Sequence, residues 1–185
     1  MVVTPLKNGG LKCQVSDFAL LIDPPASARG DITLHTHVDL PLPLTADEMI
    51  NTAGEYEISG VRIRGVQIKD ESSEKEIRTV YVAKLDEMSL CFLGELSSAL
   101  SSETMDRLGE VDVLFLSTGE RGLDEKKAAA LIKEMEPKVA IFTACKDSKA
   151  LAAALGKSPE VVEKFTAKRK DLSEDALRLL IMQAA

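Results

Sequence analysis

The sequence predicts a mixed α/β sandwich, in which layered β-sheets are covered by helices. Apolar runs bounded by turn residues fill the first half of the chain, and strand-like runs alternate with helix-like segments in the second half. The 185 residues, 45% of them hydrophobic, suffice for one compact core. We therefore expect a single domain over residues 1–185.

Seven apolar runs are predicted to be strands, because polar or turn residues bound each of them. Val61–Ile68 alternates apolar with polar or small residues, which is typical of a strand with one solvated face. Val111–Leu116 is almost continuously apolar, which indicates a strand covered on both faces. The seven runs are Phe18–Ile22, Ile32–Leu34, Val61–Ile68, Thr79–Ala83, Ser89–Leu93, Val111–Leu116 and Val139–Thr143.

Polar capping residues and apolar periodicity predict three helices. The second is the clearest, because Asp124 precedes it and Pro137 follows it. The first begins after Ser101 or Ser102, and Gly156 closes the third. The predicted ranges are Glu103–Leu108, Glu125–Met135 and Ser148–Leu155.

The C-terminal segment has two interpretations, because short apolar runs do not separate strand from helix. Val161–Ala167 and Ala176–Met182 would be two strands that flank the polar turn Lys168–Asp175. In the other interpretation, Leu177–Met182 is a helix.

The composition argues against two classes of partner. A net charge of −7, only 4% aromatic residues and no Trp disfavour binding to nucleic acid. No stretch approaches the roughly 20 apolar residues of a membrane span, and no signal-peptide pattern begins the chain. We expect a cytoplasmic protein with no membrane partner.

Cysteine and histidine are scarce, at 3 and 2 residues. Cys13, Cys91 and Cys145 lie far apart and form no Cys-x-x-Cys pair, so the sequence predicts neither a disulfide framework nor a thiolate zinc site. Cys91 lies in an apolar run and is predicted to be a small buried hydrophobic residue.

The densest polar motif, residues 35–39, directly follows the predicted strand Ile32–Leu34. In an extended chain alternate side chains share a face, so His35, His37 and Asp39 could converge on a divalent metal.

A structural interpretation of the same motif is also open. Its histidines would bond to neighbouring backbone at a polar strand end, before the Pro41 and Pro43 loop stops sheet pairing. Glu95, at another strand end, is a second candidate carboxylate or a surface acid in a turn. No Gly-x-Ser-x-Gly elbow and no phosphate loop is present.

Several segments together resemble the metallo-β-lactamase superfamily, in particular its short prokaryotic zinc-dependent hydrolase-like branch related to ascorbate-6-phosphate lactonase. The resemblance covers most of the chain and lies in the order and spacing of the segments. It implies an αβ/βα four-layer sandwich with two mixed β-sheets and a hydrolytic metal site where strand ends meet. The matching segments are Leu20–Pro24, Asp31–His37, Gly54–Val61, Val66–Glu71, Leu93–Leu96, Gly109–Leu114 and Glu136–Ile141.

The family's Thr-His-x-His-x-Asp-His motif is only partly retained. Aligned on Thr36-His37, it keeps His37 as first ligand but places Asp39, Pro41 and Leu42 at the next three ligand positions. A shifted alignment of residues 35–39 with His-x-His-x-Asp keeps two histidines and a carboxylate, at the expense of the strand register.

The remaining ligand positions implied by the family are also changed. Lys69 replaces a His ligand, Glu95 replaces the bridging Asp, and Ala144 replaces the last His. A Lys ammonium repels a cation and could instead pair with Glu95 or Asp39.

The main hypothesis is a degenerate, non-catalytic member of the fold that has no metal cofactor and is retained for binding or assembly. Zinc hydrolases hold each ion with three or more protein ligands, and two histidines do not assemble a binuclear site. The pocket would lie between His37, Asp39, Lys69, Glu95 and Ala144. Residues 54–60 and 70–76 would flank it, or serve as polar connecting loops.

Two other hypotheses remain. The first is a metal-dependent hydrolase of a small phosphorylated or lactone substrate. It would hold zinc or another divalent metal through His35 or His37 with Asp39 and Glu95, and Asp39 would activate water. The second is a structural subunit that forms homo-oligomers through a sheet edge or an apolar surface. The sequence identifies no particular ligand or partner.

Overall fold

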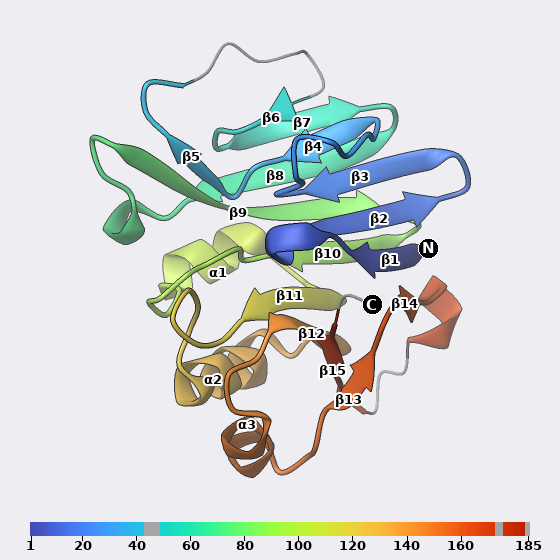
Figure 1. The fold of residues 1–185 in the computed structure, drawn as a ribbon, viewed down its shortest axis with the longest axis vertical. Helices are drawn as coiled ribbons and strands as arrows, with labels where there is room; N and C mark the ends of the chain where they lie inside the picture. Colours follow the sequence, from blue (N-terminus) through green and yellow to red (C-terminus); the bar gives the residue numbers. More distant parts are fainter. Residues whose placement is uncertain (43–48, 173–175, 184–185) are drawn as a thin grey trace.

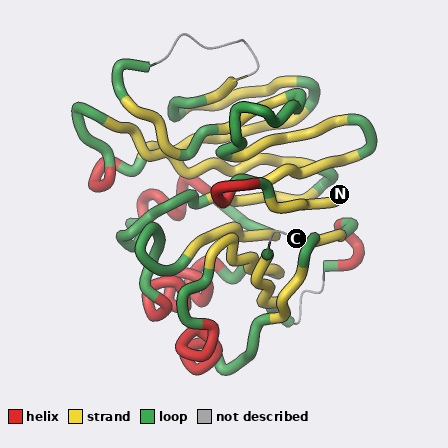
Figure 2. Tube along the Cα trace, viewed as in Figure 1, coloured by secondary structure: helices red, strands yellow, loops and turns green. Residues whose placement is uncertain are grey.

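The computed structural model describes residues 1–42, 49–172 and 176–183. Two β-sheets are stacked, and the helices lie on the side of the larger sheet (Figure 1). Figure 2 shows how strongly strands dominate the upper part of the molecule. The predicted mixed α/β class with two mixed sheets is confirmed.

The smaller sheet has six strands in the order β14-β1-β2-β3-β4-β6. Its junctions are antiparallel from β14 to β3 and parallel from β3 to β6, so it is a mixed sheet. The strands are β1 (Val2–Pro5), β2 (Leu11–Val15), β3 (Phe18–Ile22), β4 (Ile32–Leu34), β6 (Met49–Ile50) and β14 (Phe165–Thr166).

The larger sheet has nine strands, with the order β13-β15-β12-β11-β10-β9-β8-β7 and with β5 paired to β9. Strands β13 to β10 run parallel, and β10 to β7 run antiparallel. The strands are β5 (His37–Asp39), β7 (Gly54–Ile58), β8 (Val61–Gln67), β9 (Glu76–Leu85), β10 (Met88–Phe92), β11 (Val113–Ser117), β12 (Val139–Ala144), β13 (Glu160–Val162) and β15 (Arg178–Met182).

Three α-helices begin at capping residues, as predicted. Ser101, rather than Ser102, caps the first helix and accepts a hydrogen bond from the Thr104 amide at 3.2 Å. Asp124 accepts one from the Lys127 amide at 2.8 Å. The described residues include no helix that is both long and apolar enough to cross a bilayer. The helices are α1 (Ser102–Leu108), α2 (Glu125–Met135) and α3 (Ser148–Leu155), with short 3₁₀ turns η1 (Lys7–Gly9), η2 (Lys69–Glu71) and η3 (Arg169–Asp171).

Apolar side chains fill two separate layers. One layer lies between the sheets and includes the stacked rings of Phe92 and Phe115, whose centroids are 4.8 Å apart. The other lies between the larger sheet and all three α-helices. The layers are thus sheet, sheet and helices, and the described residues form no helical layer outside the smaller sheet. Cys91 is fully buried, as predicted.

The C-terminal segment differs from the expected single strand over Val161–Ala167, and it decides between the strand and helix interpretations of Leu177–Met182. Val161–Ala167 is not one strand, because β13 joins the larger sheet and β14 joins the smaller one. The helical interpretation of Leu177–Met182 is wrong, since β15 pairs with β12 in the sheet. Part of the expected turn, residues 173–175, lies outside the described residues, as does Pro43.

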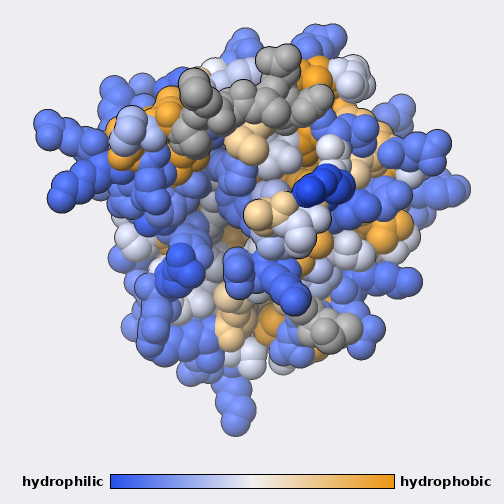
Figure 3. Space-filling view, turned by 45° about the horizontal axis from the view of Figure 1, so that its top comes forward, coloured by the Kyte–Doolittle hydropathy of each residue, from blue (hydrophilic) through white to orange (hydrophobic). Residues whose placement is uncertain are grey.

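The face in Figure 3 is mainly hydrophilic, and its apolar residues form separate small patches. Among the described residues, the exposed large hydrophobic side chains are those of Val2, Leu42 and Val161. They come from three different parts of the chain.

Candidate functional site

A cavity of about 860 Å³ opens where strand ends of the two sheets meet. Its walls include residues at or just beyond the carboxyl ends of β3, β4, β10, β11 and β12. Ligands commonly bind beyond the carboxyl ends of parallel strands, because loops diverge there. Of the predicted site residues, His35, His37, Glu95 and Ala144 line this cavity.

Asp23 and Thr36 join two parts of the cavity wall. The Asp23 carboxylate accepts hydrogen bonds from the Thr36 amide at 2.7 Å and from the Thr36 hydroxyl at 2.6 Å. Burial raises the pKa of Asp23, with a smaller contribution from the charge of Glu95, and the Thr36 hydrogen bonds and His35 oppose the rise. This pair fastens the end of β3 to the crossing between β4 and β5.

The chain changes sheets at Thr36, and this separates the two histidines. The His35 amide bonds to Ile50 of the smaller sheet, whereas the Thr36 carbonyl accepts from the Thr79 amide in the larger sheet. His35 lies beside Asp23, with 4.0 Å between Nδ1 and Oδ1. The prediction that His35, His37 and Asp39 share one strand face is therefore wrong for His35.

His37 and Asp39 do share a face, and the structure adds Glu76 to them. His37 Nε2 lies 2.8 Å from Glu76 Oε2 and 3.8 Å from Asp39 Oδ1. Asp39 lies directly opposite Glu76 in the antiparallel pairing of β5 with β9. The Asp39 side chain is 91% exposed, so this group lies at the rim of the cavity.

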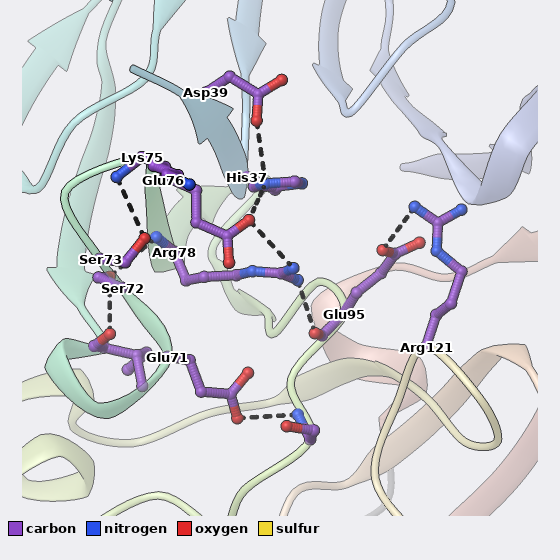
Figure 4. A network of polar contacts seen from close by, with 12 residues as sticks. His37, Asp39, Glu71, Ser72, Ser73, Lys75, Glu76, Arg78, Glu95 and Arg121 are labelled. Carbon is purple, nitrogen blue, oxygen red and sulfur yellow. Dashed lines mark hydrogen bonds and ion pairs between the residues drawn. The ribbon is translucent and has the colours of Figure 1, made fainter. Parts of the chain in front are cut away.

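Two arginines interact with the carboxylates around this rim (Figure 4). Arg78 donates from Nη1 to the Glu95 carbonyl at 2.9 Å, and its Nη2 lies 3.7 Å from Glu76 Oε2. Arg121 Nη2 lies 3.0 Å from Glu95 Oε2. The Glu95 carboxylate, in the position of the family's bridging Asp, is therefore paired with Arg121.

Lys69 does not take the place that the sequence suggested. It begins the exposed η2 turn, outside the cavity wall, and within the described part of the chain it pairs with neither Glu95 nor Asp39. The last residue of the same turn, Glu71, instead accepts hydrogen bonds from the backbone amides of Ser97 and Ser98. Lys69 follows a strand, as its alignment requires, but η2 leaves its side chain in solvent.

The flanking segments also differ from their expected role. Residues 54–58 form the edge strand β7 and do not line the cavity. Within residues 70–76, Glu76 is the residue that contacts His37 at the rim. Ala144 lies at the end of β12 on the cavity wall, where its methyl group offers no ligand atom.

The cavity side chains do not fit the metal centre that the fold family implies. Asp23 is bonded to Thr36, Glu95 is paired with Arg121, and His35 is 4.0 Å from Asp23. Over residues 1–42, 49–172 and 176–183, the one group of three His, Cys, Asp or Glu ligand atoms within 4.8 Å of each other is His37, Asp39 and Glu76. This group could supply three ligands to one ion, but its partner Arg78 carries a positive charge.

Sequence reasoning missed Glu76, Arg78 and Arg121. Glu76 and Arg78 reach the site only through the long-range register of β5 on β9, for which no local pattern gives a signal. Arg121 lies in a turn between Gly119 and Gly122, and the two glycines indicate a turn but no functional role. Asp23 lies within the matching segment Leu20–Pro24, and its place between an apolar run and Pro24 is the sequence signal for a polar strand terminus.

The comparisons with known proteins agree with this architecture. The family model described as "Beta-lactamase superfamily domain" matches residues 13–144. None of the curated proteins compared matches the sequence.

Solved structures resemble the whole chain. One, from Thermotoga maritima, carries the description of a Zn-dependent hydrolase of the metallo-β-lactamase superfamily; it is 21% identical, with TM-score 0.77, over 98% of this chain and 99% of that one. The metallo-β-lactamase fold protein YhfI of Bacillus subtilis is 10% identical, with TM-score 0.63, over 99% and 96%.

A metallo hydrolase of the archaeon Ignicoccus hospitalis is 14% identical, with TM-score 0.65, over 90% of this chain and 99% of that one. At such identities these likenesses establish the fold alone. The similar structures have the metallo-β-lactamase fold, and the two mixed sheets of this chain are arranged in that fold. Because the family model spans most of the sequence, the chain belongs to the β-lactamase superfamily.

Proposed function

We propose that this chain is a hydrolase-like member of the superfamily that has lost its hydrolytic metal centre and uses the remaining cavity to bind a ligand. The observation that carries the proposal is that the carboxylates of the cavity are already engaged by other side chains of the protein. Glu95 is paired with Arg121, and Asp23 is held by Thr36. A metal ion would have to displace these contacts before it gained its own.

The cavity supports a binding role. Its volume of about 860 Å³ falls in the range of small-molecule sites, roughly 300–1,000 Å³. Its walls combine hydroxyl groups, charges of both signs and apolar side chains such as Leu11 and Ile22. A small polar organic molecule suits such a lining better than a purely apolar one, because polar walls must be satisfied when water leaves.

A second candidate function is supported by a specific observation. His37, Asp39 and Glu76 place three ligand atoms within 4.8 Å of each other, which is the minimum set for a mononuclear catalytic ion. The chain would then hydrolyse a small phosphorylated or lactone substrate, with Glu76 rather than Glu95 as the second carboxylate.

One substitution separates the two candidates. The wild-type protein and His37→Ala are assayed for bound zinc and manganese, and for turnover of a phosphate ester and a lactone with either metal added. Equal metal content and equal background turnover support the binding role. Metal and turnover that are both present in the wild type and both lost in His37→Ala would establish the hydrolase. Ser73→Ala, at an exposed position near the rim, is the matched control.

A further inference from the structure

We propose that Arg78 acts as a built-in cation that keeps a latent metal site, formed by His37, Asp39 and Glu76, closed to divalent ions. This inference rests on the proposed function, and it names the group that keeps metal away. The ligand class of the latent site is a divalent transition metal, because one imidazole and two carboxylates suit zinc, cobalt or manganese.

The side chains of His37, Asp39, Glu76 and Arg78 form two neighbouring cross-strand pairs between β5 and β9. In the antiparallel register Asp39 lies opposite Glu76, and His37 lies opposite Arg78. Residues two apart on a strand project from the same face, so all four side chains belong to one face. Figure 4 shows them converging from the two strands.

The ligand atoms of His37, Asp39 and Glu76 are close enough together to bind one ion. Tetrahedral bonds of about 2.1 Å place neighbouring ligand atoms roughly 3.4 Å apart. The distances from His37 Nε2 to Glu76 Oε2 and to Asp39 Oδ1, 2.8 and 3.8 Å, lie on either side of that value. An ion between the three ligand atoms would replace the 2.8 Å hydrogen bond between His37 and Glu76.

The fourth side chain, that of Arg78, carries a positive charge that is held in place. Arg78 Nη2 lies 3.7 Å from Glu76 Oε2, and Nη1 donates to the Glu95 carbonyl at 2.9 Å. The Arg78 side chain is only 19% exposed. Because the second contact holds the guanidinium in place, an incoming ion meets a charge that does not swing freely into solvent.

The charges of Asp39, Glu76 and Arg78 also disfavour a bound divalent ion. Asp39 and Glu76 carry two negative charges, one of which Arg78 offsets. A divalent ion bound there would give up part of its attraction to the carboxylates and would also be repelled by the guanidinium. Without the Arg78 guanidinium, the two carboxylates would balance the two positive charges of the ion.

The test replaces Arg78 and measures metal binding directly. Co²⁺ is titrated into wild-type protein, Arg78→Met, Arg78→Gln and the charge-preserving control Arg78→Lys, with visible absorption as the readout and Zn²⁺ calorimetry as the second. Arg78→Met and Arg78→Gln are expected to bind at least roughly tenfold more tightly than the wild type and Arg78→Lys, because a unit charge about 4 Å from a ligand atom is removed. Circular dichroism checks that each variant is folded.

Double variants assign the ligands. Adding Glu76→Gln to Arg78→Met should abolish the gained binding, whereas adding Glu95→Gln should leave it, because Glu95 is not one of the three ligands. A gain that survives Glu76→Gln, or that Arg78→Lys shows equally, would overturn the proposal.

The remaining outcomes separate this inference from the proposed function. Tight, stoichiometric binding by the wild type would overturn both. Weak binding by the wild type and by both charge-removing variants would overturn the inference alone. If neither Arg78→Met nor Arg78→Gln folded, Arg78 would be a structural residue, and the inference would again fail.

Discussion

The floor and the rim of the cavity are built in different ways. We define the floor as Asp23, Thr36, Gly94 and Ser117, and the rim as His37, Asp39, Glu76, Arg78, Glu95 and Arg121. Floor contacts are hydrogen bonds made by the nearly buried side chains of Thr36 and Ser117. Rim contacts are ion pairs between side chains that reach solvent.

Under the proposed function, this difference explains how the fold could persist after a change of ligand set. The floor closes the junction between two sheets, so its substitution is felt throughout the core. The rim contributes little net stability, since exposed ion pairs are typically worth roughly 0–1 kcal/mol. Ligands at the rim can therefore be exchanged at small cost in folding free energy, and the predictions below test this contrast.

The largest effect is expected for Gly94→Ala in the floor. Gly94 has φ of +66°, and a Cβ there would overlap the Thr36 hydroxyl. Both the strained backbone and the overlap lower the free energy of unfolding, by roughly 2–4 kcal/mol. Chemical denaturation measures the change.

Gly60→Ala is the matched control for this variant. Gly60 also has a positive φ, +77°, but its Cβ would meet no atom within 4 Å. We expect a loss of about 1 kcal/mol, from backbone strain alone. Equal losses at the two glycines would show that the floor is not closely packed on Thr36.

The next largest effect is expected for Thr36→Val, which removes the 2.6 Å hydrogen bond to Asp23 and keeps the side-chain shape. We expect the free energy of unfolding to fall by roughly 1–3 kcal/mol, because the partly buried Asp23 carboxylate loses one of its two donors on Thr36. Thr33→Val on the neighbouring strand is the control, with a change below about 0.5 kcal/mol. A similar value for both variants would contradict the clamp between β3 and the β4–β5 crossing.

A smaller, pH-dependent effect is expected for Glu71, which fastens η2 to the loop beneath the rim. Partial burial acts to raise its pKa, but hydrogen bonds from Ser98 and Ser97 outweigh burial and lower the pKa below the ordinary 4.5. A lowered pKa stabilises the fold above the unfolded value, and this stability is lost as the pH falls through the folded value.

Urea unfolding between pH 7 and pH 3 checks this sign. Below about pH 4.5 the wild type should lose stability more steeply than Glu71→Gln, which has no charge to lose. Glu74→Gln, on the exposed part of the same segment, should follow the wild-type slope. Parallel curves for the wild type and Glu71→Gln would refute the role of this carboxylate.

The smallest effect is expected for Arg121→Gln at the rim. The Arg121 side chain is 75% exposed, so losing its pairing with Glu95 should change the free energy of unfolding by less than about 1 kcal/mol. High salt should reduce the difference further. A loss as large as that of Gly94→Ala would remove the distinction between floor and rim.

Local patterns predicted much of the scaffold. The caps Asp124 and Ser101, the alternating run that became β8 and the buried run that became β11 all depend on neighbours in the sequence. Two failures occurred where the chain changes sheets. Both the His35–His37 motif and the Val161–Ala167 run contain such a change, and no local periodicity records it.

Part of the candidate site was predictable, either from the alternation of His37 and Asp39 along the chain or from positions that the family resemblance supplied. Glu95 and Ala144 line the cavity, because Glu95 follows β10 and Ala144 ends β12. Glu76 and Arg78 are brought to His37 by the pairing of β5 with β9, which depends on the packing of the whole domain. The charge that decides metal affinity at the rim was therefore invisible in the sequence motif.

Elemental analysis of the wild-type protein tests the central claim most directly. The protein is expressed with zinc, manganese and iron in the medium and purified without chelator. The account predicts that none of these metals is retained near one ion per chain, because Arg78 offsets the charge of Glu76 and Arg121 pairs with Glu95. Retention of close to one zinc, manganese or iron ion per chain would contradict it.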